Sequence, residues 1–287
     1  MKNVQPTSTT TSERITHRLP RPQGVMVVDE WVARQPSGVD PIVLIHGWGG
    51  TGRYWHASAE KLAETARVIV PDLPGTGRSQ PVANAQDMYD QVEALVFMLD
   101  ALNLKRVQLV GHSMGGAMSL LLSADHPERV SRAVLTSLAL FMTKEQEQLY
   151  SFVIKTFSLM IKVRPPWMTN VPGAAQFMAK EYFYRVPKDK QILRDGLEDY
   201  LSLDEGTAMA CARNATDQAI KDAAKKVNMP MMLIIGREDK RTPNENADFT
   251  AETIGDCSVR WISACGHLPM VEKPHEYMRL LRGFLDL

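Results

Sequence analysis

Residues 111–116 read Gly-His-Ser-Met-Gly-Gly, after the apolar run Arg106–Val110 and before a helical pattern over Ala117–Ala124. A strand, the pattern Gly-x-Ser-x-Gly and a helix, in that order, are typical of a nucleophile elbow, a sharp turn that exposes a reactive serine. Side chains two residues on either side of the serine would collide in such a turn, so glycine is needed at both places. The stretch therefore predicts that Ser113 is a nucleophile.

The backbone of Met114 provides a second element of the predicted site. Met114 lies at the start of the predicted helix, where N–H groups have no intrahelical partner and the helix dipole is positive. Its N–H group is therefore suited to bind a developing oxyanion. The same pentapeptide also fits an ordinary glycine-rich turn, so the assignment depends on the rest of the chain.

The composition excludes several classes of protein. The 287 residues are 44% hydrophobic, and 33 Lys and Arg residues balance 33 Asp and Glu residues, so no net charge attracts nucleic acid. Cys211, Cys257 and Cys265 are too few and too irregularly spaced for a disulfide framework or a metal site. No apolar run reaches the roughly 18 residues of a membrane span, and residues 1–24 lack the apolar core of a signal peptide. We expect a cytoplasmic enzyme.

Short β-rich runs alternate with helical patterns along most of the chain. After a Thr-, Ser- and Pro-rich arm at residues 1–22, the runs Gly24–Ala33 and Pro41–Ile45 are separated by a turn signal and are expected to form a hairpin. The later runs are Arg67–Val70, Arg106–Val110, Val130–Thr136, Met231–Ile235 and Ser258–Ile262. Strands that alternate with helices predict an α/β fold with a mostly parallel central sheet and helices on both faces.

One segment, residues 141–226, interrupts this alternation. It contains helical patterns broken by prolines and no convincing strand, and half of the chain's aromatic residues lie between 141 and 200. We expect an inserted helical unit whose aromatic side chains mostly fill its own core, while a smaller share lines an apolar pocket over Ser113. The expected organisation is an arm at 1–22, a core at 23–140 and 227–287, and the inserted unit at 141–226.

The serine needs two partners, because a hydroxyl becomes a nucleophile when a base takes its proton and a third group orients that base. Among seven histidines, His267 is preferred because it lies in a glycine-flanked loop directly after the last predicted strand. Reactive groups in open α/β sheets collect at the carboxyl ends of the strands, where Ser113 also lies. The chain order serine, acid, histidine favours Asp239, with Glu238 as a rival one residue away.

Five motifs resemble those of the α/β-hydrolase superfamily, in the same order and at the same spacings. They are His-Gly-Trp-Gly-Gly at 46–50, Asp-Leu-Pro-Gly-x-Gly-x-Ser at 72–79, Gly-His-Ser-Met-Gly-Gly at 111–116, Gly-Arg-Glu-Asp-x-x-x-Pro at 236–243 and Gly-His-x-Pro-x-x-Glu-x-Pro at 266–274. The resemblance implies Ser113 as nucleophile, Asp239 as orienting acid and His267 as base. It also implies oxyanion donors at the backbone N–H groups of Trp48 and Met114, and a helical cap at 141–226.

The implied activity is hydrolysis of carboxylic esters through an acyl-enzyme, with neither a metal nor an organic cofactor. We expect a small ester-like substrate with an apolar acyl group, contacted by Phe141 and Met142 and also by His46, Gly47 and His112. Serine in the elbow argues against dehalogenases and epoxide hydrolases, which resemble this chain but carry aspartate there. A C–C bond hydrolase of diketone-like compounds, a cofactor-free perhydrolase and a small-molecule receptor on the same scaffold are the alternatives. The sequence indicates no particular oligomeric state.

Overall fold

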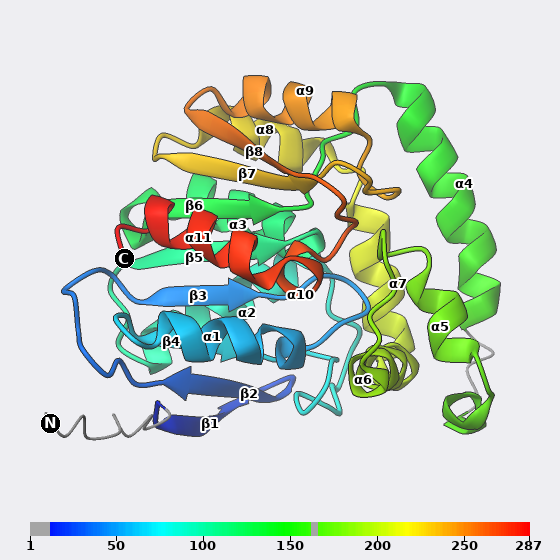
Figure 1. Ribbon diagram of the computed structural model, residues 1–287, viewed down its shortest axis with the longest axis horizontal. Helices are drawn as coiled ribbons and strands as arrows, with labels where there is room; N and C mark the ends of the chain where they lie inside the picture. The colour runs from blue at the N-terminus through cyan, green and yellow to red at the C-terminus, as the bar shows by residue number, and fades with distance from the viewer. Residues whose placement is uncertain (1–11, 162–165) are drawn as a thin grey trace, which may run out of the picture.

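The computed structural model of the protein describes residues 12–161 and 166–287. Their strands form a single sheet in the order β1-β2-β4-β3-β5-β6-β7-β8 (Figure 1). The strands are β1 (Arg14–Arg21), β2 (Gly24–Trp31), β3 (Ile42–Ile45), β4 (Val68–Pro71), β5 (Val107–His112), β6 (Val130–Thr136), β7 (Met231–Gly236) and β8 (Cys257–Ile262). β1 and β2 run antiparallel to their neighbours, and all pairs from β4 to β8 are parallel. The structure confirms the predicted α/β fold.

The central strands are buried on both faces, and β3 shows how. Val43 and Ile45 pack into one hydrophobic layer and Ile42 and Leu44 into another, because successive side chains of a strand point to opposite faces. The first layer contains residues of α2 (Met88–Ala101), α3 (Met114–Asp125), α8 (Gln218–Lys226) and α9 (Asn244–Ile254). The second contains residues of α1 (His56–Leu62), α10 (Pro269–Glu272) and α11 (Pro274–Phe284). A strand between two such layers must be apolar throughout, as β3 is.

The N-terminal part of the sheet differs from the prediction. Arg14–Arg21 is not part of a loose arm, because it pairs antiparallel with β2. β1 lies at the sheet edge and its side chains are mostly exposed, so its sequence lacks the apolar pattern of a buried strand. The predicted hairpin between residues 24–33 and 41–45 is also wrong. β2 pairs with β1 and β4, whereas the fully apolar β3 takes a central position between β4 and β5.

Between β6 and β7 the described residues form helices and loops. We call one group of them the helical insertion, which lies beyond one end of the sheet (Figure 1): α4 (Lys144–Ile161), the short 3-10 helix η3 (Pro166–Asn170), α5 (Ala174–Ala179), α6 (Lys190–Ser202) and α7 (Glu205–Asn214). The next helix, α8, is different, because Ile220, Ala223 and Ala224 pack in the same layer as α3. The predicted boundary at residue 226 is therefore too late. No helix in the described parts of the chain is long and apolar enough to cross a membrane.

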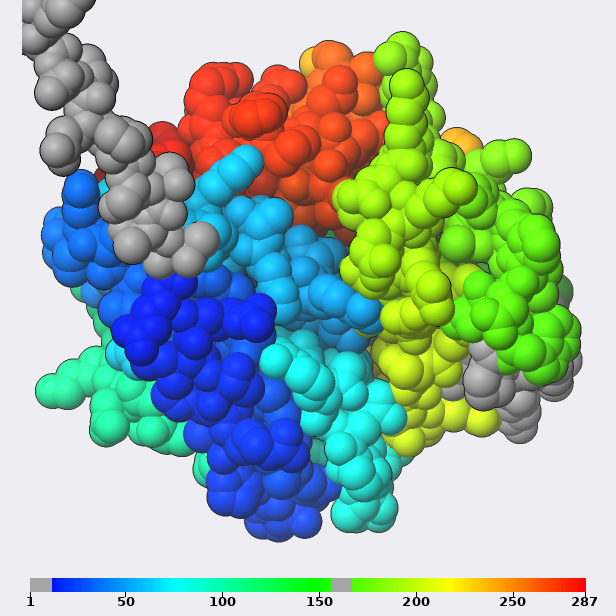
Figure 2. All heavy atoms as spheres, turned by 60° about the horizontal axis from the view of Figure 1, so that its bottom comes forward, coloured from blue at the N-terminus to red at the C-terminus, as the bar shows by residue number. Residues whose placement is uncertain are grey.

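Polar side chains join the helical insertion to the core. Arg53, before α1, pairs with Asp195 of α6 at 2.9 Å and also with Asp199. Thr51 Oγ1 donates a hydrogen bond to Asp199 Oδ2 at 3.0 Å. In Figure 2 the yellow-green segment that contains α6 meets the blue and cyan segments that contain these core residues. These polar contacts add to apolar ones, because Phe183 and Leu193 belong to a hydrophobic cluster that packs against Leu268 and Val271 of the core.

Candidate active site

The turn between β5 and α3 has the strained geometry that the sequence predicts. Ser113 adopts φ 52° and ψ −117°, a conformation that residues with a Cβ atom rarely occupy. A Cβ atom at Gly115 would lie 2.5 Å from the Ile45 carbonyl oxygen, and one at Gly111 would collide with the Gly115 backbone. Glycine is therefore required on both sides. The turn places Ser113 on the wall of a large cavity.

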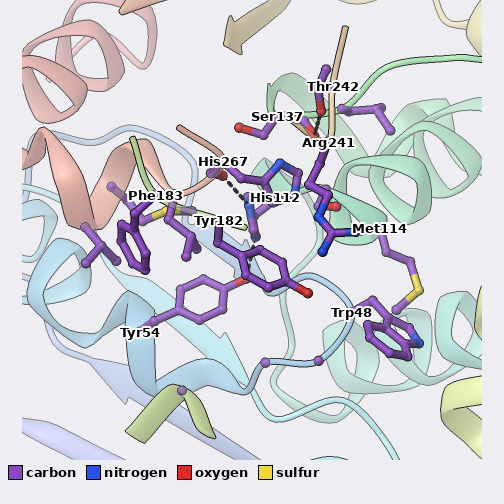
Figure 3. A pocket seen from close by; sticks show the side chains of 18 of the residues that line it. Trp48, Tyr54, His112, Met114, Ser137, Tyr182, Phe183, Arg241, Thr242 and His267 are labelled. Atoms are coloured by element: carbon purple, nitrogen blue, oxygen red, sulfur yellow. Dashed lines mark hydrogen bonds between the residues drawn. The ribbon is translucent and has the colours of Figure 1, made fainter. Parts of the chain in front are cut away.

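The two predicted oxyanion donors, Trp48 and Met114, line the same cavity as Ser113. Met114 is the first residue of α3, so its N–H group has no intrahelical acceptor. Trp48 lies in the loop after β3, and both residues line the same cavity as Ser113. The Trp48 indole nitrogen donates to the Ala208 carbonyl oxygen of α7 at 2.8 Å. Figure 3 shows Trp48 and Met114 at one side of the cavity. The arrangement is suited to two N–H groups that bind one oxyanion.

The predicted base and acid are in contact. His267 Nδ1 and Asp239 Oδ2 are 2.8 Å apart, and both residues are buried. Burial raises the pKa of Asp239, but His267 and the backbone N–H groups of Arg241 and Thr242 outweigh it, so the pKa lies below its usual value. Ionised Asp239 accepts the Nδ1 proton, and Nε2 of His267 is then the nitrogen able to take a proton from a hydroxyl.

Glu238, the rival acid, is not bonded to the imidazole. Its Oε2 accepts a hydrogen bond from the Cys265 N–H group at 2.9 Å. The carboxylate therefore fixes the loop before His267 instead of the ring itself. A second contact fixes the same loop from the other side, because the His267 N–H group donates to the Tyr182 carbonyl oxygen at 2.7 Å.

The Ser113 hydroxyl is free within the cavity. Among the described residues it has no hydrogen-bond partner, although His267 lines the same space. Hydrogen bonds between a nucleophile and its base are often long or misaligned without substrate and shorten in the reacting complex. Ser113 and His267 thus line the same cavity, and Asp239 is hydrogen-bonded to His267.

His112 connects the two loops that flank the serine. Its Nε2 donates to the His267 carbonyl oxygen at 2.9 Å, so Nδ1 must accept the hydrogen bond from the Tyr54 hydroxyl, also 2.9 Å long. The Tyr54 oxygen accepts in turn from the Gly47 N–H group at 2.6 Å. Burial, with the nearby His267, lowers the pKa of His112 to about 3. His112 is therefore neutral and fully bonded, which excludes it as the base.

The cavity has a volume of about 860 Å³. One wall consists of Trp48, Ser113, Met114 and His267 with their loops, which follow the ends of strands. We call it the catalytic wall because it carries residues predicted to be catalytic. The opposite wall is rich in aromatic side chains of the helical insertion and its loops: Tyr150, Tyr182, Phe183 and Tyr200. Phe141 also lines the cavity, as predicted, and its ring lies 5.1 Å from that of Tyr150.

Three predicted substrate contacts do not line this cavity. His46 is completely buried, where its Nε2 accepts a hydrogen bond from the Leu73 N–H group at 3.0 Å. Gly47 uses its N–H group to bind Tyr54. Met142 is 41% exposed on the outside of the molecule. These three predictions were wrong, because adjacency in the chain does not place a side chain in the cavity.

Sequence reasoning also missed three cavity residues, Arg53, Tyr54 and Arg241. Arg53 and Tyr54 follow the glycine-rich loop after β3, and Arg241 lies two residues after the acid. The sequence signal that could have identified them is their position beside or within the motifs at 46–50 and 236–243. Within the described residues, no group of His, Cys, Asp or Glu side chains is arranged to hold a metal ion.

Comparison with known proteins gives the family. Residues 40–274 match the family model described as the alpha/beta hydrolase fold. The chain belongs to this alpha/beta hydrolase family. The pimeloyl-[acyl-carrier protein] methyl ester esterase of Aliivibrio fischeri is 25% identical to this hydrolase over 259 residues, 85% of this chain and 93% of that protein. The 2-hydroxymuconate semialdehyde hydrolase of a Pseudomonas species is 28% identical over 261 residues, 85% of this chain and 86% of that protein.

A solved structure shows the same fold. The bromoperoxidase from Bacillus anthracis matches this alpha/beta hydrolase with a TM-score of 0.79 at 21% identity, over 96% of this chain and 100% of that one. Together with the family match, the strained serine and the paired imidazole and carboxylate describe a hydrolase. The geometry is suited to nucleophilic attack by a serine on a carbonyl carbon.

Proposed function

We propose that the protein cleaves carboxylic esters through an acyl-enzyme on Ser113. The single observation on which this rests is that His267, 2.8 Å from Asp239, lines the same cavity as a serine with φ 52°. Strain of this kind persists only where the surrounding structure enforces it, and it is common at reacting groups. The methyl ester esterase from Aliivibrio fischeri, 25% identical, is a relative whose reaction supports this proposal.

In the first half of the reaction, His267 Nε2 takes the proton of the Ser113 hydroxyl as the oxygen attacks the ester carbonyl carbon. The carbonyl oxygen becomes an oxyanion and binds the N–H groups of Trp48 and Met114. Each such donor typically contributes about 3 kcal/mol to transition-state binding. The carbonyl re-forms as the C–O bond breaks, and His267 gives its proton to the leaving alkoxide, which departs as an alcohol.

In the second half, water repeats the attack. His267 takes a proton from water, the hydroxide adds to the acyl carbon and the same two N–H groups bind the oxyanion. Collapse of this intermediate releases the carboxylic acid, and His267 returns the proton to Ser113. Asp239 stays ionised throughout and stabilises the imidazolium that forms in each half.

We also propose roles for the two sides of the cavity. The helical insertion acts as a cap, because its aromatic residues close the space above Ser113, and it binds the acyl group. This assignment follows from the apolar character of that wall, which is suited to a small organic substrate. We further propose that the protein acts in the cytoplasm.

The experiment is a hydrolysis screen of p-nitrophenyl esters from acetate to palmitate, together with lactones and a vinylogous diketone. We expect turnover of short or medium esters, labelling of Ser113 by a serine-directed phosphonate, and loss of both in Ser113→Ala. Turnover of the diketone alone would favour C–C cleavage, an alternative supported by the 28% identical 2-hydroxymuconate semialdehyde hydrolase. Labelling without turnover of any substrate would contradict an esterase and favour a receptor.

A further inference from the structure

Arg241 lies in the cavity but has no role in the proposed acyl transfer. Its backbone N–H group donates to Asp239 Oδ1 at 2.8 Å, which fixes the residue beside the acid. Its side chain lies over Tyr182, with Cζ 4.9 Å from the ring centroid. The Tyr182 ring in turn lies 6.0 Å from the His267 ring. Figure 3 shows the guanidinium directed into the cavity, on the side of Met114.

The charge of this guanidinium is not neutralised within the described chain. Arg53, another cation at the cavity, pairs with Asp195 and Asp199. In contrast, no carboxylate among residues 12–161 and 166–287 forms an ion pair with Arg241, which is an exposed residue. Burial raises the pKa of Tyr150 in α4 to about 12, and the positive charge of Arg241 acts in the opposite direction. The guanidinium charge therefore also acts on the helical insertion.

An unpaired cation distinguishes between two kinds of acyl group. A substrate that fills the cavity removes water from the guanidinium, and an aliphatic chain offers no hydrogen-bond acceptor in exchange, so the charge is left desolvated and unpaired. A carboxylate restores the lost interactions, because its two oxygens match the planar N–H groups of arginine. One face of the planar guanidinium already lies over the Tyr182 ring. Its N–H edges are therefore the part available to a ligand.

We propose that Arg241 binds a carboxylate on the acyl group, so that the preferred substrates are monoesters of short dicarboxylic acids. This inference rests on the proposed ester hydrolysis and specifies its substrate class. The ester carbonyl lies at Ser113, and the free carboxylate extends through the cavity to the guanidinium. Arg241 is a residue that determines specificity and takes no part in proton transfer.

The test compares monoethyl adipate with the matching carboxamide, ethyl 6-amino-6-oxohexanoate, which has nearly the same shape and no charge. Hydrolysis is followed by ethanol release in the parent, Arg241→Gln and Arg241→Lys. Arg237→Gln is the matched control, since Arg237 also stacks on a ring, that of Trp261 at 5.1 Å, but does not line the cavity. The glutamine and lysine variants keep the backbone N–H group that binds Asp239.

We expect the parent and Arg237→Gln to favour the carboxylate ester by about 10- to 100-fold in kcat/KM, mainly through KM. Arg241→Gln should bring this ratio close to one, and Arg241→Lys should keep part of it, because an ammonium group lacks the bidentate geometry. A parent that does not distinguish the two esters, or an Arg241→Gln variant that keeps the preference, overturns the inference.

A second measurement separates this inference from the proposed function. Binding of adipate and of its monoamide is measured by calorimetry in the same proteins, which requires no turnover. Selective adipate binding that disappears in Arg241→Gln, with no ester hydrolysed, would support the carboxylate site and contradict the esterase. Hydrolysis of p-nitrophenyl butyrate without any carboxylate selectivity would support the esterase and overturn the carboxylate site.

Discussion

The two walls of the cavity are built in different ways. On the catalytic wall, Ser113 follows β5 and His267 follows β8, while Asp239, which contacts His267, follows β7. Main-chain hydrogen bonds fix both Asp239 and His267. On the opposite wall, helices contribute side chains over the cavity and leave apolar residues exposed outside, such as Phe152 of α4 at 68%. We therefore expect the first wall to determine the reaction, and the second wall, together with Arg241 beside Asp239, to determine substrate choice. Substitutions in the first wall should change kcat by orders of magnitude, and those in the second should change selectivity modestly.

The largest effect should come from Ser113→Ala. Without the oxygen nucleophile no acyl-enzyme forms, so kcat for an activated ester should fall by about 10⁶-fold. The fold should be retained, because Ser113 Oγ bonds no other described residue. Steady-state kinetics and the melting temperature measure the two parts. A variant that keeps more than about a hundredth of the parent kcat would contradict the assignment.

Asp239→Asn should have the second largest effect. An amide favours the wrong imidazole tautomer and cannot stabilise an imidazolium, so kcat should fall by about 10⁴-fold. Glu238→Gln is the matched control, because a glutamine carbonyl can still accept from the Cys265 N–H group. Its kcat should stay close to the parent value. Equal losses of kcat in both variants would contradict a specific role for Asp239 and would show that both carboxylates only support the loop.

The catalytic wall should also make the protein sensitive to acid. Because the pKa of His112 is lowered to about 3, the unfolded chain binds a proton between about pH 6.5 and 3 that the folded protein does not. The free energy of unfolding should therefore decrease as the pH falls, by up to about 1.4 kcal/mol per pH unit from this residue. His112→Asn should give a shallower slope in denaturant titrations from pH 7 to 4. The exposed His275→Asn is the control, and an unchanged slope in His112→Asn would refute the buried neutral ring.

A smaller effect is expected from Tyr54→Phe. It removes the acceptor of the Gly47 N–H group and the donor to His112, which loosens the loop that carries Trp48. Because this loop provides an oxyanion donor, kcat should fall roughly tenfold with little change in KM. Tyr277→Phe is the control, since it also loses a buried hydroxyl contact, with Thr136 at 2.7 Å, but lies outside the cavity. Similar changes of kcat in both variants would show a general loss of stability instead.

The smallest effect should come from the opposite side of the cavity. Phe141 is half-buried and its ring lies 5.1 Å from that of Tyr150, so Phe141→Ala should enlarge the space for the acyl group. Preference should shift toward bulkier acyl groups by roughly tenfold in kcat/KM. Chain-length profiles and melting curves on the same variant provide the measurement. An unchanged chain-length profile, with a loss of stability near the 3–5 kcal/mol of a fully buried phenylalanine, would show that Phe141 only fills space between the helical insertion and the core.

The sequence contained enough to predict that Ser113 and His267 meet at one cavity and that Asp239 contacts His267, because backbone geometry there requires particular residues at fixed spacings. Gly111 and Gly115 are forced by close backbone approach, and β3 is apolar because it is buried on both faces. β1 was missed because an edge strand needs only a partner, not an apolar pattern. The role of α8 was missed because the amphipathic pattern of Ile220 and Ala223 does not show whether a helix covers the sheet or the cavity.

The hydrogen bond from the His267 N–H group to the Tyr182 carbonyl oxygen limits how this protein can diversify. A Cβ atom at Gly266 would lie 2.6 Å from that carbonyl oxygen, so the two segments touch with no space between them. Changes in the length or surface of α4 should leave His267 in place. A deletion near Tyr182 should instead displace His267 and abolish the proposed ester hydrolysis. We therefore expect evolutionary change in the helical insertion to accumulate in α4. The segment around Tyr182 should stay constant, because it holds His267 in position.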